Sequence, residues 1–174
     1  REQALFVPSE DGLNVVGLLA LHLFTPEIDV KRSVERFEEV GTALATIEEA
    51  GNRDVVLLHC VSNYPADPAN SNLLAMKTMR NAFDVLVGFS DHTLGAEVAL
   101  AAVALGACVV EKHFTLDRTL PGPDHGASLE PEELRAMVEG IRIVESSLGD
   151  GDKRPTEGEQ EMAAIVRRSL VAAD

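Results

Sequence analysis

Short apolar runs alternate with helix-length segments along most of this chain. Apolar runs of strand length occupy residues 55–64, 85–90 and 108–114. Segments of helix length lie between and around them, at 33–50, 71–83, 94–106, 128–148 and 157–170. Most of these carry apolar residues at helical spacing, whereas 94–106 is apolar almost throughout and is predicted to be buried on most sides. A repeat of this kind predicts parallel strands joined by right-handed crossovers.

Two α/β architectures satisfy this repeat, an open doubly wound sheet and a (β/α)₈ barrel. Polar residues gather at the C-terminal ends of three successive predicted strands, where barrel proteins assemble their sites. We therefore favour the parallel barrel. Residues 1–32 predict no clear element, because the apolar stretch 12–24 has neither strand nor helix periodicity.

Two histidines close two of the strand-like runs at equivalent places. His92 follows Ser90 and His113 follows Glu111, so each histidine shares a strand face with a polar residue two positions before it. Adjacent parallel strands lie about 4.8 Å apart, so the two imidazoles can share one metal ion. The alternative is that each histidine only hydrogen-bonds its surroundings at a strand end. The matching positions of the two histidines favour the metal site.

The charge balance narrows the possible partners. The chain has 15 basic and 29 acidic residues and a net charge of −14, which argues against nucleic acid, because binding it requires clustered Lys and Arg. No apolar run is long enough to span a bilayer, so no membrane partner is expected. Cys60 and Cys108 lie inside strand-like runs and are predicted to be buried free thiols, as in a reducing, cytoplasmic location.

Three stretches of the sequence resemble the sialic acid synthase (N-acetylneuraminate synthase) family: LLHCVSNYP, GFSDHTLG and EKHFTLDRTLPGPDHGASLEPEEL. The resemblance runs from about residue 38 to residue 170. It implies a TIM barrel followed by a small antifreeze-like domain, of which this chain supplies the last three β/α units of the barrel. The expected division is a poorly matching lead-in and helix at 1–50, the barrel units at 51–149, and a linker toward an absent antifreeze-like domain at 150–174.

The resemblance also implies a reaction. Members of the family condense phosphoenolpyruvate with N-acetylmannosamine or a related N-acyl aldose, giving a nine-carbon 2-keto sugar acid and phosphate. A divalent cation makes the aldehyde more electrophilic. With imidazole ligands Mn²⁺ is expected, and Mg²⁺ is the alternative. The resemblance further implies a cytoplasmic homodimer that acts on small-molecule substrates.

Carried over to this sequence, the family pattern assigns His92 and His113 as the two metal ligands. Ser90 matches a phosphate contact, and its hydroxyl can donate to a phosphate oxygen. Glu111 is expected to orient a ligand or a bound water.

The remaining expected site residues lie before and after this pair. Ser62, Asn63 and Tyr64 match positions that line the phosphate and sugar sites, with Tyr64 placed among the catalytic residues. Asp124 matches a catalytic carboxylate near the hydroxyl groups of the sugar. For Tyr64 and Asp124 the alternatives are a strand-end anchor and a turn residue.

Two other functions remain open. One is a different metal-dependent enzyme on the same barrel, such as an aldolase or a deoxy-sugar-acid synthase. The other is a non-catalytic or incomplete barrel fragment that retains the metal side. The incomplete fragment is favoured by an absence. The resemblance predicts lysines for the carboxylate and phosphate of phosphoenolpyruvate on strand-loop segments, and residues 1–32 show no such segments. Lys112 is predicted to point off the inward face, and we expect no turnover from this chain alone.

Overall fold

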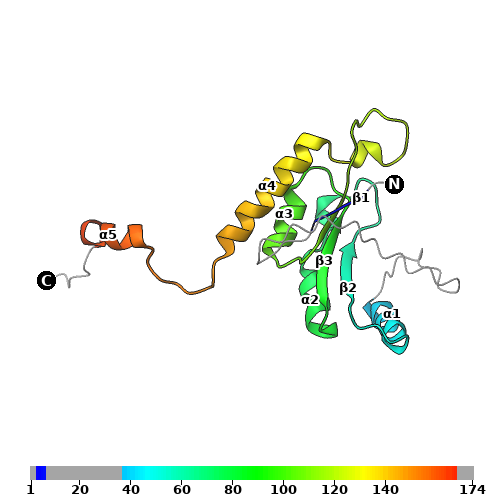
Figure 1. Cartoon of the computed structure of the whole chain (residues 1–174), viewed down its shortest axis with the longest axis horizontal. Coiled ribbons are helices and arrows are strands. Elements are labelled where there is room, and N and C mark those ends of the chain that lie inside the picture. The colour runs from blue at the N-terminus through cyan, green and yellow to red at the C-terminus, as the bar shows by residue number, and fades with distance from the viewer. Residues whose placement is uncertain (1–2, 7–36, 168–174) are drawn as a thin grey trace.

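The computed structural model describes residues 3–6 and 37–167 (Figure 1). The strands are β1 (Gln3–Phe6), β2 (Val56–Cys60), β3 (Leu86–Asp91) and β4 (Val110–His113). The α-helices are α1 (Phe37–Glu49), α2 (Leu74–Phe83), α3 (Glu97–Ala104), α4 (Pro131–Leu148) and α5 (Glu157–Val166). Single 3₁₀ turns, η1 (Pro68–Asn70) and η2 (His125–Ala127), lie in two of the loops. The stretch 12–24 and the predicted helix start at 33–36 lie outside the described residues.

The described strands form one sheet in the order β1-β4-β3-β2. β2, β3 and β4 are parallel neighbours, which confirms the predicted parallel strands. Ser90 lies opposite Glu111 and Asp91 lies opposite Lys112, so the two strand ends are level with each other. β1 pairs antiparallel with β4, a long-range contact that the sequence pattern did not reveal.

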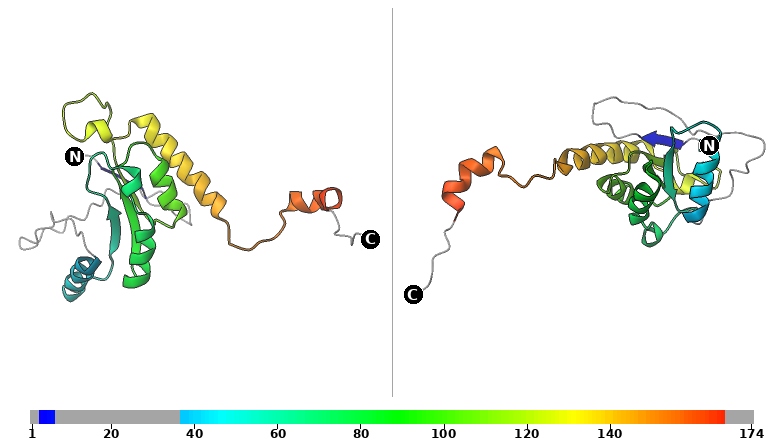
Figure 2. Two further views of the ribbon diagram at one scale, coloured as in Figure 1. Left: turned by 180° about the vertical axis from the view of Figure 1, so that it is seen from behind. Right: turned by 90° about the horizontal axis from the view of Figure 1, so that it is seen from below.

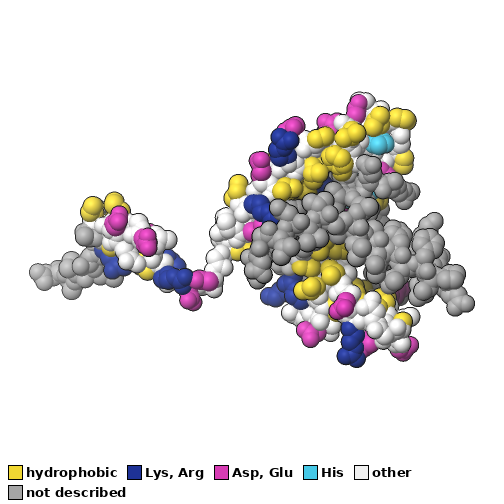
Figure 3. Space-filling model, viewed as in Figure 1, with side chains coloured by type: hydrophobic (Ala, Val, Ile, Leu, Met, Phe, Trp, Pro, Cys, Tyr) yellow, Lys and Arg dark blue, Asp and Glu magenta, His cyan; other side chains and the backbone are white. Residues whose placement is uncertain are grey.

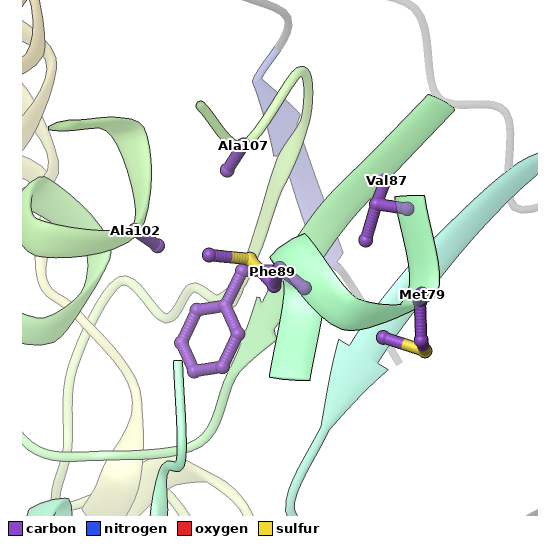
Figure 4. Packing of buried hydrophobic residues seen from close by; sticks show 6 residues of the cluster. Met79, Val87, Phe89, Ala102 and Ala107 are labelled. Carbon is purple, nitrogen blue, oxygen red and sulfur yellow. The ribbon is translucent and has the colours of Figure 1, made fainter. Parts of the chain in front are cut away.

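Helices α2 and α3 cover one face of the parallel strands, as both views of Figure 2 show. Val87 and Phe89 project from β3 into a cluster with Met76, Met79, Ala102 and Ala107. Figure 4 shows the Phe89 ring within this cluster, near Ala102. Because Val87 and Phe89 are each only 1% exposed, burial of each side chain stabilises the fold by about 1.5–3 kcal/mol.

A second apolar cluster joins α4 to the strands through α3. Its buried members are Ala99, Val103, Val110, Leu129, Met137 and Ile141. The 18 residues of α4 thus bury one stripe and leave the other side in solvent, as its sequence spacing predicted.

Strand β2 is shorter than its apolar run. The predicted strand 55–64 ends at Cys60, because the carbonyl oxygen of Val61 accepts a hydrogen bond from the His92 ring rather than from a strand. β2 is half-buried along its middle, and Cys60 at its end is exposed. The prediction that Cys60 is a buried residue was therefore wrong. Cys108 is half-buried, and both cysteines are free, as expected.

Helices α2, α3 and α4 each begin three residues later than the predicted segments at 71–83, 94–106 and 128–148. Asn70 belongs to η1, and α2 starts at Leu74 without a side-chain cap. Ser128 does not cap α4, because its hydroxyl donates to the carbonyl oxygen of Asp124 instead. A capping box of Glu130 and Glu133 starts α4 at Pro131, and proline suits that first position because its missing N–H has no helical partner.

The two outer helices differ in how they meet the sheet. In α1 the residues Val40, Leu44 and Ile47 form a half-buried stripe, and Phe37 stacks on Phe83 of α2 with 4.7 Å between ring centroids. Helix α5 stands apart from the sheet beyond an extended segment in Figures 1 and 2.

Charged side chains are dispersed over the face drawn in Figure 3, where Lys and Arg lie singly among acidic groups. Within residues 3–6 and 37–167, no helix combines the length and apolar character that crossing a membrane requires.

Candidate functional site

The polar strand ends meet on the face of the sheet opposite α2 and α3. Side chains alternate along a strand, so Ser90 and Glu111 point away from the helices that cover Phe89 and Val110. The Ser90 hydroxyl donates to Oε1 of Glu111 across the two strands at 2.5 Å. Ser90 precedes His92 and Glu111 precedes His113 by two positions on the same face. This hydrogen bond therefore lies directly beneath the histidine pair and forms the floor of the site.

His92 and His113 lie side by side above that floor, with 5.4 Å between their ring centroids. Each of the two residues is only 7% exposed. Nε2 of His92 lies 2.8 Å from the Tyr64 hydroxyl oxygen, and Nε2 of His113 lies 3.1 Å from the same oxygen. The Tyr64 ring stacks on His92 at 3.9 Å and meets His113 edge-on at 5.0 Å. Two imidazole nitrogens therefore point at one position, which the tyrosine hydroxyl occupies.

The hydrogen bonds of His92 define its tautomer. Its Nδ1 lies 2.8 Å from the carbonyl oxygen of Val61, which can only accept, so Nδ1 carries the hydrogen. Nε2 then presents its lone pair, and the Tyr64 hydroxyl donates to it. Burial lowers the pKa of His92, and the neighbouring His113 lowers it further. The neutral imidazole with a free Nε2 lone pair is the form that binds metal ions.

The residues present fit a metal that takes two protein ligands. Among the residues that the structure describes, no three His, Cys, Asp or Glu side chains gather closely enough to hold an ion by themselves. An ion held by Nε2 of His92 and Nε2 of His113 therefore needs oxygen ligands from water or a substrate. Such a site keeps open positions, as catalytic metal sites do.

Cys60 also neighbours this pair, whereas the sequence pattern predicted it only as a buried thiol. Its Sγ lies 3.7 Å from Nδ1 and 3.8 Å from Nε2 of His92. Although the residue as a whole is exposed, desolvation of its thiol raises the pKa of Cys60. The thiol therefore stays uncharged at neutral pH. The alternation of side chains along β2 was the signal that placed Cys60 on this face.

The other expected site residues lie in the loops that follow β2 and β4. Ser62 and Asn63 are exposed in the segment between β2 and Tyr64. Asp124 is half-buried just before η2 in the long loop after β4. Within that loop the neighbouring His125 lies with its Nδ1 2.8 Å from the hydroxyl oxygen of Thr115. The structure thus brings together Tyr64, Ser90, His92, Glu111 and His113, and a substrate contact of Ser62, Asn63 or Asp124 stays a prediction.

Lys112 lies on the helix-covered side of β4, as the sequence predicted. It is 1% exposed, and its Nζ donates to Oδ2 of Asp91 at 2.8 Å. This buried ion pair between neighbouring strand ends was not foreseen, although Asp91 and Lys112 each stand next to a histidine in the sequence.

A parallel α/β sheet with a histidine pair at its C-terminal strand ends is typical of enzymes that assemble their sites at that edge. The chain belongs to the NeuB family, whose model matches residues 3–153. The resemblance seen in the three sequence stretches is thereby confirmed.

Relatives and solved structures agree with this membership. The chain is 43% identical over 168 residues to the N,N'-diacetyllegionaminic acid synthase of Campylobacter jejuni, a match that covers 95% of this chain and 50% of that protein. It is 42% identical over 113 residues to the N-acetylneuraminate-9-phosphate synthase of Drosophila melanogaster, covering 64% of this chain and 30% of that protein.

The N-acetylneuraminic acid synthetase of Leptospira borgpetersenii, solved with citrate, matches with a TM-score of 0.67 and 38% identity, over 79% of this chain and 49% of that one. The chain thus spans half or less of the length of these proteins.

Proposed function

We propose that this chain carries the metal-binding part of a synthase that condenses phosphoenolpyruvate with N-acetylmannosamine or a related N-acyl aldose, giving a nine-carbon 2-keto sugar acid and phosphate. The observation that supports it most is the convergence of Nε2 of His92 and Nε2 of His113 on one hydroxyl oxygen, at 2.8 and 3.1 Å. Relatives named as synthases of legionaminic, pseudaminic and N-acetylneuraminic-type acids support the reaction class.

The fold proposed for this function is a TIM-type barrel of which β2, β3 and β4 are consecutive strands. Their order in the sheet follows their order in the chain, and α2 and α3 pack on the same face of β3. Consecutive parallel strands with all crossovers on one side are the arrangement that closes into a barrel. The face opposite the helices then lies toward the barrel axis.

Each residue of the candidate site has a role in this proposal. His92 and His113 hold a divalent cation, Mn²⁺ or alternatively Mg²⁺, which supplies Lewis-acid activation of an aldehyde when bound. Ser90 donates its hydroxyl to an anionic oxygen, which in the structure is Glu111 and in the proposal is a phosphate oxygen. Glu111 would orient a metal ligand or a bound water from its position beneath the two histidines.

The residues outside this group complete the substrate site. We assign Ser62, Asn63 and Tyr64 to the phosphate and sugar sites, and Asp124 to the hydroxyl groups of the sugar. Ser62 and Asn63 are both exposed, so a ligand can reach them. A homodimer and a cytoplasmic location stay predictions.

A chimera tests the proposal. Residues 37–150 of this chain replace the aligned segment of the Campylobacter relative, and phosphate release is assayed with Mn²⁺, phosphoenolpyruvate and a panel of N-acyl aldoses. We expect the chimera to release phosphate with at least one aldose and His92→Ala to abolish that release. The matched control is His59→Ala, because His59 belongs to the same sheet and its ring packs against Phe89 on the helix-covered side.

Two results would contradict the proposal. One is a folded chimera that releases no phosphate while the parent protein does. The other is an equal loss from His92→Ala and His59→Ala, which would remove any special role of the histidine pair. The same assay on the unmodified chain is expected to show no turnover.

A further inference from the structure

A buried ion pair lies directly behind the two histidines, on the helix-covered side of the sheet. The side chains of Asp91 and Lys112 are 0% and 1% exposed, and they occupy opposite positions on the neighbouring strands β3 and β4. No step of the proposed reaction uses either charge, because both side chains point away from the site.

The hydrogen bonds of this ion pair join the residues on both sides of His92 to Lys112 on the neighbouring strand. Oδ1 of Asp91 accepts from the N–H of Thr93 at 2.9 Å and from its hydroxyl at 2.8 Å. Nζ of Lys112 donates to the carbonyl oxygen of Thr93 at 2.6 Å, besides its bond to Asp91. Asp91 and Thr93 flank His92, and Lys112 immediately precedes His113. One bonded group therefore ties together the two strand ends that carry the imidazoles.

Stability alone does not account for this arrangement. Removing two charges from water costs free energy, and well-packed apolar residues often serve a fold as well as a buried ion pair does. What apolar residues lack is direction, since a charged hydrogen bond holds its atoms at a defined distance and angle. Two metal ligands on separate strands need such definition, because a shift of a few tenths of an ångström alters their shared geometry.

We propose that Asp91, Thr93 and Lys112 form a clamp that sets the spacing of His92 and His113, so that both Nε2 atoms meet one ligand. They are positioning residues, since they act through the histidines and touch no substrate. The inference rests on the proposed metal role of the pair. The clamp nevertheless positions the two rings in the metal-free protein as well. It can therefore be tested without metal, independently of the proposed metal role.

The test uses a double variant of the full chain, Asp91→Asn with Lys112→Met. Lys112→Met alone would leave a buried carboxylate without its partner, so both charges are removed together. Asparagine keeps an acceptor for the N–H and hydroxyl of Thr93, and methionine fills the volume of lysine. The tie between the strands is then the main feature lost. Ile141→Val in the α4 cluster is the control for a general loss of stability, because Ile141 is fully buried in that second cluster.

Two measurements are made on folded protein well below the unfolding midpoint. Isothermal titration with Mn²⁺ is expected to show at least about tenfold weaker binding in the double variant than in wild type and Ile141→Val, the lower end of the range for supporting residues of metal sites. In the metal-free protein, the imidazole proton resonances of His92 and His113 are expected to shift, because their rings move relative to the Tyr64 ring. Those of His125 are expected to stay in place.

Unchanged resonances of His92 and His113 in a folded double variant would overturn the clamp, whatever the metal does. Unchanged Mn²⁺ affinity would overturn it as well. If wild type binds no Mn²⁺, the proposed function loses its metal centre, and the resonances alone then decide whether the clamp positions the two rings. If the double variant does not fold, Lys112→Arg is measured instead, and wild-type resonances in that variant would equally overturn the clamp.

Discussion

The two faces of the parallel strands carry different kinds of residue. On the face covered by α2, α3 and α4, Val87, Phe89 and Val110 are at most 1% exposed and lie in apolar clusters, with the Asp91–Lys112 ion pair buried beyond them at the strand ends. On the opposite face, Leu86 at the start of β3 is 61% exposed, whereas the polar groups at the other end of the strand are buried around the histidine pair. Because side chains alternate between the two faces along a strand, a single substitution changes one face at a time. Loss of stability and loss of metal binding should therefore appear in different variants.

The largest expected effect is on the helix-covered face. Phe89→Ala removes a ring that is 1% exposed from the cluster with Met76 and Met79, and it should lower the free energy of unfolding by about 3–5 kcal/mol. Leu86→Ala on the same strand is the control and should change it by no more than about 0.5 kcal/mol. Urea denaturation followed by circular dichroism measures both. Similar losses in the two variants would mean that the two faces do not differ as described.

The next effect concerns the contact between strands on the site face. A β-carbon at Gly88 would lie 2.5 Å from the carbonyl oxygen of Val109 and 2.7 Å from Cδ2 of Leu58. Gly88→Ala must therefore push β3 and β4 apart, and we expect a loss of about 1–3 kcal/mol in the free energy of unfolding. At Gly158 an added β-carbon meets no atom within 4 Å, so Gly158→Ala is the control. A loss in Gly88→Ala no greater than in this control would show that the strands tolerate separation.

Tyr64→Phe separates the hydroxyl from the ring that stacks on His92. The hydroxyl competes with a metal for the Nε2 lone pair, and a hydrogen bond contributes about 0.5–1.5 kcal/mol net, so Mn²⁺ should bind about 2- to 10-fold more tightly. Thr115→Val is the control, since it removes a hydroxyl from a different histidine, His125. Calorimetric titration compares the three proteins, and weaker binding in Tyr64→Phe would mean that the hydroxyl assists the metal.

The smallest effect lies outside both faces, at the start of α4. The Arg118 guanidinium, and then the N–H of Glu130, hold the pKa of Glu133 below its ordinary value. A lowered pKa means that this carboxylate stabilises the fold above its ordinary pKa and that the contribution is lost as the pH falls through the lowered value. Glu133→Gln should therefore lower Tm slightly at pH 7 and make less difference at pH 3. A constant difference across this range would exclude the charged interaction as its cause.

Much of the fold follows from patterns that local physics controls. The apolar runs predicted β2, β3 and β4, and the spacing of Ser90, His92, Glu111 and His113 predicted their common face, because side chains alternate along any strand. The end of β2 was missed, since the carbonyl of Val61 bonds to a histidine about thirty positions later. The pairing of β1 with β4 likewise depends on residues that are distant in the sequence.

The site was predicted unevenly for the same reason. Residues on regular strands lie where the sequence predicted. Tyr64 lies in a loop, and the alternation of side chains along a strand does not predict the position of a loop residue. Asp91 and Lys112 gave no local signal of their pairing. Their partnership becomes visible only when β3 and β4 are in register.

Mn²⁺ titration of the full chain tests the central claim most directly, namely that His92 and His113 jointly hold a divalent cation. The chain has one tyrosine and no tryptophan, so the emission of Tyr64 reports on the site itself. We predict one binding event in wild type and in the His59→Ala control, with affinity at least about 100-fold lower in His92→Ala and in His113→Ala, since loss of a ligand should exceed loss of a supporting residue. Equal affinity in all four proteins would contradict the account.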